Sequence, residues 1–187
     1  MAGGGPVAEL CLAGPGEALV CPMARIVLRI LGWHYPGVMR SLWTNGLLLA
    51  DQIDELVRLG LSTVIITINA FTRETSGRLY ERLTYRGRGY RGGDAGILLS
   101  EKQWLGLSLA KDLGMRVVVH TSLIPWVNEQ DLEHIVRRAG ILGSDGMALT
   151  SPAASGNIGR QGGVLRALLK EKRSELGVYL PQIDLLL

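Results

Sequence analysis

Five short segments of the sequence are polar or rich in glycine, and each follows a run of apolar residues. Hydroxyl, amide, imidazole and carboxylate groups bind small molecules through hydrogen bonds and charge, and glycines let the backbone approach a ligand closely. Each segment alone is typical of an ordinary turn or helix cap, but together they favour a small-molecule site. The segments are residues 14–17 (Gly-Pro-Gly-Glu), 44–46 (Thr-Asn-Gly), Asn69, 120–122 (His-Thr-Ser) and 150–152 (Thr-Ser-Pro).

The apolar runs alternate with helical patterns, and these elements must position the polar segments. Residues 63–68 read Thr-Val-Ile-Ile-Thr-Ile, which is typical of a buried strand. Ser100 is predicted to cap a helix, with Gln103 at the capping-box position. In chain order we expect strands at 7–13, 38–43, 63–68, 115–119 and 147–149, and helices at 22–31, 50–59, 100–113, 129–138 and 164–176.

The five strand-then-helix units, with no hairpin signal between them, predict parallel strands joined by right-handed crossovers. Runs that are apolar on both faces predict strands covered on both sides. A closed or partly closed βα barrel and an open doubly wound sheet both agree with this order, and five units are too few for an eight-stranded barrel. Either architecture brings the carboxyl ends of the strands, and so the polar segments, to one rim.

Several segments resemble, in order and spacing, the radical S-adenosylmethionine proteins of nitrogenase iron–molybdenum cofactor biosynthesis, the NifB family. The likeness extends over roughly residues 8–165 and rests on collinear order, since no single motif is decisive. The segments are 11–17 (Cys-Leu-Ala-Gly-Pro-Gly-Glu), 43–46 (Trp-Thr-Asn-Gly), 64–70 (Val-Ile-Ile-Thr-Ile-Asn-Ala), 85–103 with its Tyr-Arg-Gly-Arg-Gly-Tyr start, and 118–132 with its Val-Val-His-Thr-Ser-Leu-Ile-Pro start.

This resemblance implies an α/β fold, a partial (β/α)6 TIM-like barrel of the radical S-adenosylmethionine type. The chain would supply strands two to six as a single incomplete core domain over residues 1–187, with the first βα unit missing. It also implies S-adenosylmethionine as the ligand. Gly14, Gly16 and Glu17 match the segment that holds the methionine amino group, which suits a carboxylate beside an ammonium.

The resemblance assigns further residues to the same ligand. Thr44, Asn45 and Asn69 match positions that offer hydrogen bonds to the methionine carboxylate and the ribose hydroxyls. The residues matched to the ribose and adenine side are Ser122, Ile124 and Pro125, with Met147 and Leu149 supporting the adenine by backbone and apolar contact.

The sequence departs from the family where the iron–sulfur cluster would be held. Radical S-adenosylmethionine enzymes bind a [4Fe–4S] cluster through three thiolates spaced Cys-x3-Cys-x2-Cys, and family members also carry a late Cys-x2-Cys pair. Cys11 and Cys21 have neither spacing. We therefore expect no metal ligands in this chain and no radical chemistry by the chain alone. A fragment, one part of a split protein that lacks an N-terminal segment, and a decayed paralogue all agree with this.

Four single residues carry separate expectations. Cys11 is expected to be a small core residue, whereas Cys21, beside Pro22 at a helix start, is better placed for reactivity. His120 takes the place of an asparagine of the family and is a candidate ligand or hydrogen-bond donor. Trp126 takes the place of a glycine. No cluster of histidine, cysteine and carboxylate has the spacing of metal ligands.

The stretch from Arg78 to Arg91 alternates arginines with tyrosines and glycines. This pattern resembles an RNA-binding segment of the RGG type. We favour instead a loop over the barrel mouth that contacts an anionic cluster or substrate, and we expect no nucleic-acid binding. The residues concerned are Arg82, Arg86, Arg88 and Arg91, with Tyr80, Tyr85 and Tyr90.

The composition is that of a globular domain, with 187 residues, 47% hydrophobic and 20% charged. It excludes collagen, coiled coils, disulfide scaffolds and wholesale disorder. A mean hydropathy of +0.21 is high for a soluble domain and predicts apolar surface hidden against a partner or a part of the fold outside this chain. Without a signal-peptide pattern or a run long enough to span a bilayer, we expect a cytoplasmic protein with no membrane contact.

Three functions follow as hypotheses. The first is a radical S-adenosylmethionine protein that resembles the nitrogenase cofactor-maturation enzyme, which cleaves the ligand reductively and helps assemble an iron–sulfur–carbide precursor. Its partners would be an iron–sulfur cluster donor or nitrogenase maturation proteins. The second is a non-catalytic module that binds S-adenosylmethionine or an iron–sulfur partner. The third is another βα-barrel enzyme for a phosphorylated small molecule, for which the glycines at 156–163 are a weak candidate. Whether this chain is an enzyme stays open.

Overall fold

The structure is a computed structural model that describes residues 7–150 and the backbone of 183–185. The predicted helix at 164–176, the glycines at 156–163 and residues 151–152 lie outside the described residues. In chain order the elements are β1 (Glu9–Leu12), η1 (Ala18–Val20), α1 (Pro22–His34), β2 (Met39–Thr44), α2 (Leu49–Arg58), β3 (Thr63–Thr67), α3 (Arg73–Leu79), β4 (Arg82–Tyr85), β5 (Arg88–Arg91), α4 (Gly92–Asp112), β6 (Arg116–Ser122), η2 (Glu129–Asp131), α5 (Leu132–Ile141), β7 (Gly146–Thr150) and β8 (Ile183–Leu185).

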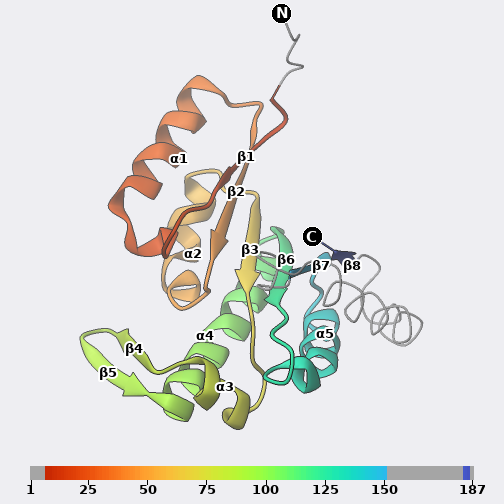
Figure 1. Ribbon diagram of the computed structural model, residues 1–187. Coiled ribbons are helices and arrows are strands. Elements are labelled where there is room, and N and C mark those ends of the chain that lie inside the picture. Colours follow the sequence, from red (N-terminus) through yellow and green to blue (C-terminus); the bar gives the residue numbers. More distant parts are fainter. Residues whose placement is uncertain (1–6, 151–182, 186–187) are drawn as a thin grey trace, which may run out of the picture.

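The main sheet has six parallel strands in the order β1-β2-β3-β6-β7-β8 (Figure 1). The predicted alternation of parallel strands and helices is confirmed. Each strand adds to the same side of the one before it, so the order never reverses as it does in a doubly wound sheet. The strand order therefore removes the doubly wound alternative. Strand β8, at the far edge, was not predicted from the sequence.

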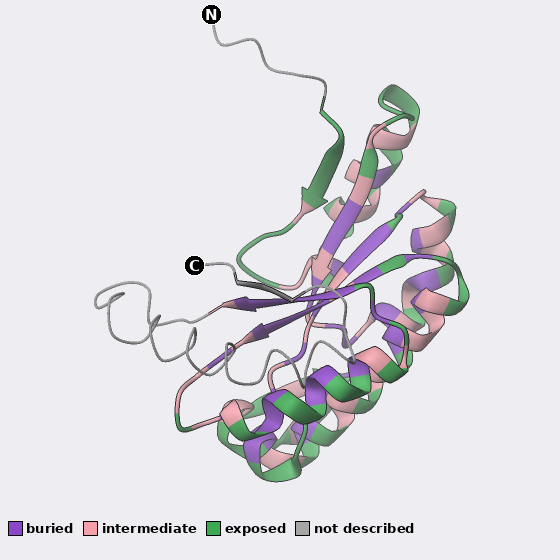
Figure 2. Cartoon of the chain, turned by 90° about the vertical axis from the view of Figure 1, so that its right-hand side faces the viewer, coloured by how far each residue is buried: buried purple, intermediate pink, exposed green. Residues whose placement is uncertain are grey.

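The hydrophobic core lies between the sheet and the helices, which are on one side of the sheet (Figures 1 and 2). Alternate residues of β3, Val64 and Ile66, have no exposed surface and point into this core. Helix α2 packs against them with Ile53 and Leu56, the apolar stripe of an amphipathic pattern. The packing of this core holds the carboxyl ends of the strands in register.

The second face of the sheet, away from the helices, is less uniformly buried. In β3 the alternate side chains Ile65 and Thr67 are half-buried, as is Trp43 in β2. His120 of β6, which pairs in register with Thr67, is 6% exposed. Strands covered on both sides were expected. This holds for the helix side, whereas the second face has both buried and half-buried residues.

The prediction that a helix begins at Ser100 is wrong. Helix α4 begins at Gly92, directly after β5, and Ser100 lies inside it. Its first two turns contain glycines because α3 packs closely there: a Cβ at Gly96 would lie 2.0 Å from Ser76 Cβ, and one at Gly93 would lie 2.8 Å from Arg73 Cγ. Glycine is a poor helix former, so the sequence pattern hid this part of the helix.

The stretch predicted as an irregular loop also forms regular structure. Helix α3 comes first, and β4 and β5 then form an antiparallel hairpin whose two-residue turn is Arg86 and Gly87. Both turn residues have positive φ, 50° and 75°, as a type I′ turn requires. The usual Asn-Gly or Asp-Gly signal is absent because arginine takes the first position. The sequence pattern therefore gave no signal for this hairpin, which lies between β3 and α4.

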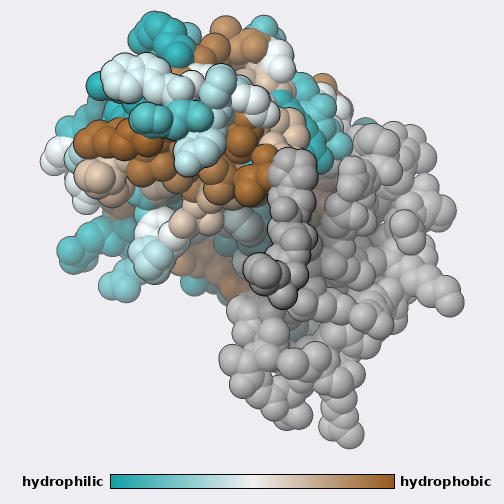
Figure 3. Space-filling view, turned by 90° about the horizontal axis from the view of Figure 1, so that it is seen from above, coloured by the Kyte–Doolittle hydropathy of each residue, from teal (hydrophilic) through white to brown (hydrophobic). Residues whose placement is uncertain are grey.

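The β1 edge of the sheet is loosely covered. Cys11 in β1 is exposed, which contradicts its prediction as a core residue. The reason is that β1 is an edge strand whose four residues are exposed or only half-buried. Helix α1 next to it exposes Met23, Ile26 and Ile30, and apolar side chains gather on this end of the molecule (Figure 3).

None of the helices in the described part of the chain is long and apolar enough to cross a membrane.

Candidate functional site

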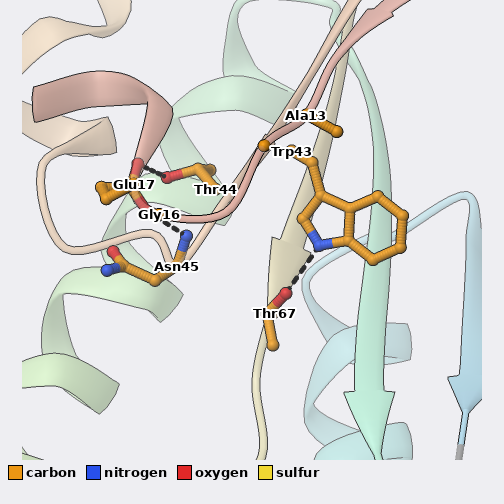
Figure 4. A pocket seen from close by; sticks show the side chains of 8 residues that line it. Ala13, Gly16, Glu17, Trp43, Thr44, Asn45 and Thr67 are labelled. Atoms are coloured by element: carbon orange, nitrogen blue, oxygen red, sulfur yellow. Dashed lines mark hydrogen bonds between the residues drawn. The ribbon is translucent and has the colours of Figure 1, made fainter. Parts of the chain in front are cut away.

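One cavity lies at the carboxyl ends of the first three strands of the sheet (Figure 4). Its volume is about 380 Å³, within the range of small-molecule sites. The structure thus brings together five of the residues predicted from the sequence. The lining residues are Ala13, Gly14, Gly16, Glu17, Trp43, Thr44, Asn45 and Thr67.

The Glu17 carboxylate joins the loop after β1 to the end of β2. Its Oε1 accepts hydrogen bonds from the Leu19 N–H (3.0 Å) and from Thr44 Oγ1 (2.6 Å). Its Oε2 accepts one from the Asn45 N–H (2.6 Å). A carboxylate has about four acceptor positions, so three bonds leave room for one further donor. The position of Gly16 at φ +146° lets the chain turn into the 3-10 helix that Glu17 caps.

A side chain that the sequence pattern misassigned holds the next two strand ends together. Gln103 Nε2 donates to the carbonyl oxygens of Asn45 and Thr67, both at 2.8 Å. Gln103 was predicted at a capping position, but it is 2% exposed in the middle of α4. Gly46 gives it space, because a Cβ there would lie 2.9 Å from Gln103 Cγ. A buried amide on an apolar helix face was the sequence signal that was overlooked.

Asn69 and Ser122 meet in a second cluster, at the ends of β3 and β6. Asn69 Oδ1 accepts a hydrogen bond from the Ser122 N–H at 2.8 Å. Asn128 Nδ2 donates to the carbonyl oxygens of Asn69 and Ser122, both at 2.9 Å, and its Oδ1 accepts from the Ile124 N–H at 2.7 Å. Asn128 is fully buried and was not predicted. This cluster does not line the cavity around Glu17.

The other residues assigned to the ligand lie in different surroundings. Met147 and Leu149 of β7 are 1% and 0% exposed, and both belong to the core under the helices. Their side chains therefore point away from the second face of the sheet. Ile124 and Pro125 are half-buried in the loop after β6, next to the Asn69 and Ser122 cluster.

Asp131 is a buried carboxylate near the strand ends that was not predicted from the sequence. It is fully buried at the start of α5 and accepts hydrogen bonds from the N–H groups of Phe71 (2.7 Å) and Thr72 (3.0 Å). The Thr72 hydroxyl also donates to it. Asp131 thereby holds the loop after β3 against α5. Nothing in the local sequence distinguishes it from a surface acid before a helix.

His120 has both ring nitrogens engaged. Its Nδ1 lies 3.3 Å from Thr67 Oγ1, and its Nε2 lies 2.9 Å from Thr150 Oγ1. Burial lowers the pKa of the imidazole below its usual value, so the neutral ring is favoured. The His120 and Trp43 rings lie edge to face, with their centroids 4.7 Å apart. His120 is thus a hydrogen-bonding residue of the second face.

The arginine-rich hairpin packs against the body of the protein. Tyr85 is 8% exposed and donates to Asp51 Oδ2 at 2.8 Å, while Arg86 pairs with the same carboxylate at 3.2 Å. Burial raises the pKa of Tyr80 to about 12. With these two tyrosines turned inward, the aromatic platform that single-stranded nucleic acid requires is incomplete. A groove between β5 and α4 mixes arginines with acids, since its charged lining residues are Arg88, Arg91, Asp94 and Glu101.

The two cysteines do not form a metal site. Cys21 is the exposed N-cap residue of α1, with Pro22 at the first helical position, as predicted. It borders a second, largely apolar cavity of about 320 Å³ on the other side of the Gly14–Glu17 turn. Within residues 7–150, no three histidine, cysteine or acidic side chains are grouped so that they could hold a metal ion.

Comparison with known proteins identifies relatives along most of the chain. A scan against models of protein families finds no match. Among curated proteins, the chain is 33% identical over 135 residues to the FeMo cofactor biosynthesis protein NifB of Chlorobaculum tepidum, which covers 72% of this chain and 32% of that protein. It is 31% identical over 128 residues to the NifB of Methanocaldococcus infernus, covering 68% and 41%. It is 32% identical over 146 residues to the NifB of Rhizobium meliloti, which covers 76% of this chain and 30% of that protein. The chain belongs to the NifB family.

The match to NifB is partial in length, since it spans between 25% and 41% of the curated relatives. Among solved structures, an oxaloacetate acetylhydrolase in complex with 3,3-difluorooxalacetate has a TM-score of 0.49 and 12% identity, over 91% of this chain and 62% of that one. A similarity of that size does not identify a fold.

The cavity and the NifB resemblance involve the same parts of the chain. All eight lining residues fall within three of the segments that resemble the family, namely 11–17, 43–46 and 64–70. The conclusion that follows from the sequence family and the one that follows from the geometry therefore concern one place in the molecule.

Proposed function

We propose that this chain forms the S-adenosylmethionine-binding part of a NifB-type protein and takes part in FeMo cofactor biosynthesis. The observation that carries the proposal is the gathering of the Gly14–Glu17 turn, Thr44 and Asn45 around one cavity at the strand ends. The sheet would then be part of a (β/α)6 barrel of the radical S-adenosylmethionine type, and the partners would be proteins of nitrogenase maturation.

The chemistry of the cavity suits the methionine end of the ligand. Glu17 carries the negative charge that an ammonium group requires, and its carboxylate keeps an acceptor position beyond its three hydrogen bonds. Gly14 and Gly16 are exposed and have no side chain to obstruct a ligand. Asn45 Oδ1 accepts a hydrogen bond from the Leu47 N–H at 2.9 Å, which fixes the Asn45 side chain, while the Asn45 backbone N–H donates to Glu17.

The [4Fe–4S] cluster of radical S-adenosylmethionine enzymes needs three thiolate ligands. When bound, such a cluster supplies the electron that cleaves the sulfonium bond of S-adenosylmethionine. The chain contains two cysteines, Cys11 in β1 and Cys21 before α1, and two thiolates do not meet the requirement for three. The residues present therefore do not fit the cluster, and the proposal for this chain is confined to holding the ligand.

Isothermal titration calorimetry of the 187-residue chain with S-adenosylmethionine tests the proposal. We expect saturable binding that Glu17→Ala abolishes, because the ammonium loses its partner. Glu101→Ala, which removes an exposed carboxylate from α4, is the matched control and should bind as the unaltered chain does. Absence of binding by the unaltered chain, or equal binding by both variants, would refute the assignment.

A further inference from the structure

The cavity contains one charged group and one aromatic ring. Glu17 is the only ionisable side chain among the eight lining residues, and Trp43 is the only aromatic one. A carboxylate and an indole face are both complementary to cations, the first through charge and the second through its quadrupole. We propose that Trp43 recognises the sulfonium cation of the ligand, while Glu17 takes the ammonium, so that the cavity selects for the charged sulfur. This inference rests on the proposed function.

Trp43 and Glu17 reach the cavity from different sides. Successive residues of a strand point to opposite faces, so Trp43 lies on the second face of the sheet, whereas Thr44 points to the Glu17 side. Figure 4 shows the indole next to Thr67 and the Glu17 carboxylate next to Thr44 and Asn45. The indole is half-buried, which leaves part of its surface open to a ligand. The cavity therefore offers two cation-binding groups on different sides, one for each cationic centre of the ligand.

The orientation of the indole is held by neighbouring strands. Trp43 Nε1 donates to Thr67 Oγ1 at 2.8 Å. Because an indole N–H can only donate, the Thr67 hydroxyl is the acceptor and its own proton is available for His120 Nδ1, 3.3 Å away. In the tautomer that carries its proton on Nε2, His120 donates to Thr150 Oγ1 at 2.9 Å. The indole N–H, the Thr67 hydroxyl and both His120 nitrogens, in a row from β2 to β7, thus all have hydrogen-bond partners.

The same row keeps the surroundings of the indole free of competing positive charge. The His120 and Trp43 rings lie edge to face, with their centroids 4.7 Å apart. Burial lowers the pKa of His120 below its usual value, so the imidazole beside the indole is favoured in its neutral form. His120 is therefore a positioning residue, which acts on a ligand through Trp43 and Thr67.

Two ligands that differ only at sulfur isolate the contribution of Trp43. S-adenosylmethionine has a sulfonium cation, and S-adenosylhomocysteine has a neutral thioether, while both carry the ammonium that Glu17 would bind. By calorimetry we expect the unaltered chain to bind S-adenosylmethionine about tenfold more tightly, from the usual strength of a partly desolvated cation–π contact. Trp43→Leu should bring the ratio of the two dissociation constants close to one and change S-adenosylhomocysteine binding little.

Further variants separate the ring from its support. Trp43→Phe keeps an aromatic face and should keep most of the preference. Thr67→Val removes the hydrogen bond to Trp43 Nε1 and should reduce the preference in part. Trp33→Leu removes an indole that is 77% exposed on α1, and is the control that should leave both dissociation constants unchanged.

The outcomes distinguish this inference from the proposed function. Equal affinity of the unaltered chain for both ligands would overturn the role of Trp43 and leave the ligand site intact, and this holds even if Trp43→Leu does not fold. An equal loss of affinity for both ligands in Trp43→Leu would show that the ring contributes shape alone. If neither ligand binds the unaltered chain, the proposed function itself fails, and the inference fails with it.

Discussion

Glu17 and Asp131 use the same chemistry in two loops at the carboxyl ends of the strands. Each carboxylate accepts hydrogen bonds from two backbone N–H groups and one threonine hydroxyl. They differ in surroundings. Glu17 is half-buried and borders the cavity, whereas Asp131 has no exposed surface. Hydrogen bonding alone therefore does not identify a ligand site, and access to a cavity is the feature that separates the two.

The difference extends to the regions that the two carboxylates hold. Around Asp131, the loops after β3 and β6 are further joined by the buried amide of Asn128. Around Glu17, β1 is an exposed edge strand, and the loop contacts the end of β2 chiefly through that one carboxylate. The loops on the Asp131 side are therefore joined by more hydrogen bonds than the loop that contains Glu17.

The largest expected effect is on stability. Asp131→Ala should lower the free energy of unfolding by about 3 kcal/mol, because it removes a fully buried charged acceptor of three hydrogen bonds. Glu17→Ala should cost about 1 kcal/mol, because the Glu17 carboxylate is only half-buried and water can take its place as the acceptor. Urea unfolding followed by circular dichroism measures both values. Equal losses in the two variants would remove the distinction between a structural and a ligand-facing carboxylate.

Acid should reveal a third carboxylate, Asp145, which precedes β7 at the opposite end of the sheet from Glu17 and Asp131. Burial alone would raise the pKa of Asp145, but hydrogen bonds from Lys111 and the Val117 N–H, with the charges of Lys111 and Arg116, outweigh it and hold the pKa below its ordinary 3.8. A depressed pKa stabilises the fold fully above the unfolded value, and this contribution is lost as pH falls through the folded pKa.

Asp145→Asn should therefore be less stable than the unaltered chain near neutral pH, and the difference should shrink below about pH 4. Urea unfolding of both proteins at a series of pH values measures it. A difference that stays constant down to about pH 2 would contradict the depressed pKa.

The smallest effect concerns backbone strain in the loop after β6. Trp126 has a φ of 64°, a left-handed conformation that favours glycine, and its side chain is 82% exposed. Trp126→Gly should raise the free energy of unfolding by about 0.5–1 kcal/mol. The change relieves the backbone strain, and this gain exceeds the entropy that glycine adds to the unfolded chain. In the loop that contains Glu17, the residue with a positive φ is already a glycine, Gly16 at 146°.

Trp33→Gly is the matched comparison, because Trp33 is equally exposed but helical, and the change there should cost about 1 kcal/mol. Thermal unfolding followed by circular dichroism gives the sign of each effect. Destabilisation by Trp126→Gly would show that the tryptophan makes contacts that outweigh the strain.

Most of the strands and their parallel direction could be predicted because their signals are local. The β-branched run at 63–68 became β3, and the apolar runs before each polar segment became its parallel neighbours. The β4–β5 hairpin and the start of α4 could not be predicted, because Arg86 occupies a turn position usually taken by asparagine and glycines serve close packing within α4.

The candidate site was predictable in part for the same reason. Glu17, Thr44 and Asn45 belong to the polar segments that follow the strands predicted at 7–13 and 38–43, so their place at the rim follows from the strand pattern. Trp43 and Thr67 lie within strands, where an aromatic or hydroxyl side chain reads as ordinary packing, and their place in the cavity was missed.

What the sequence by itself determined was the alternation of strands and helices, the polar groups at the strand ends, and the likeness to NifB, since each depends on residues close together in the chain. The tertiary structure alone decided the single winding direction of the sheet and the contacts between distant residues. Gln103 bonds to Asn45 across 58 positions, and His120 to Thr67 across 53. Such contacts depend on how helices and strands pack in three dimensions, which no local pattern specifies.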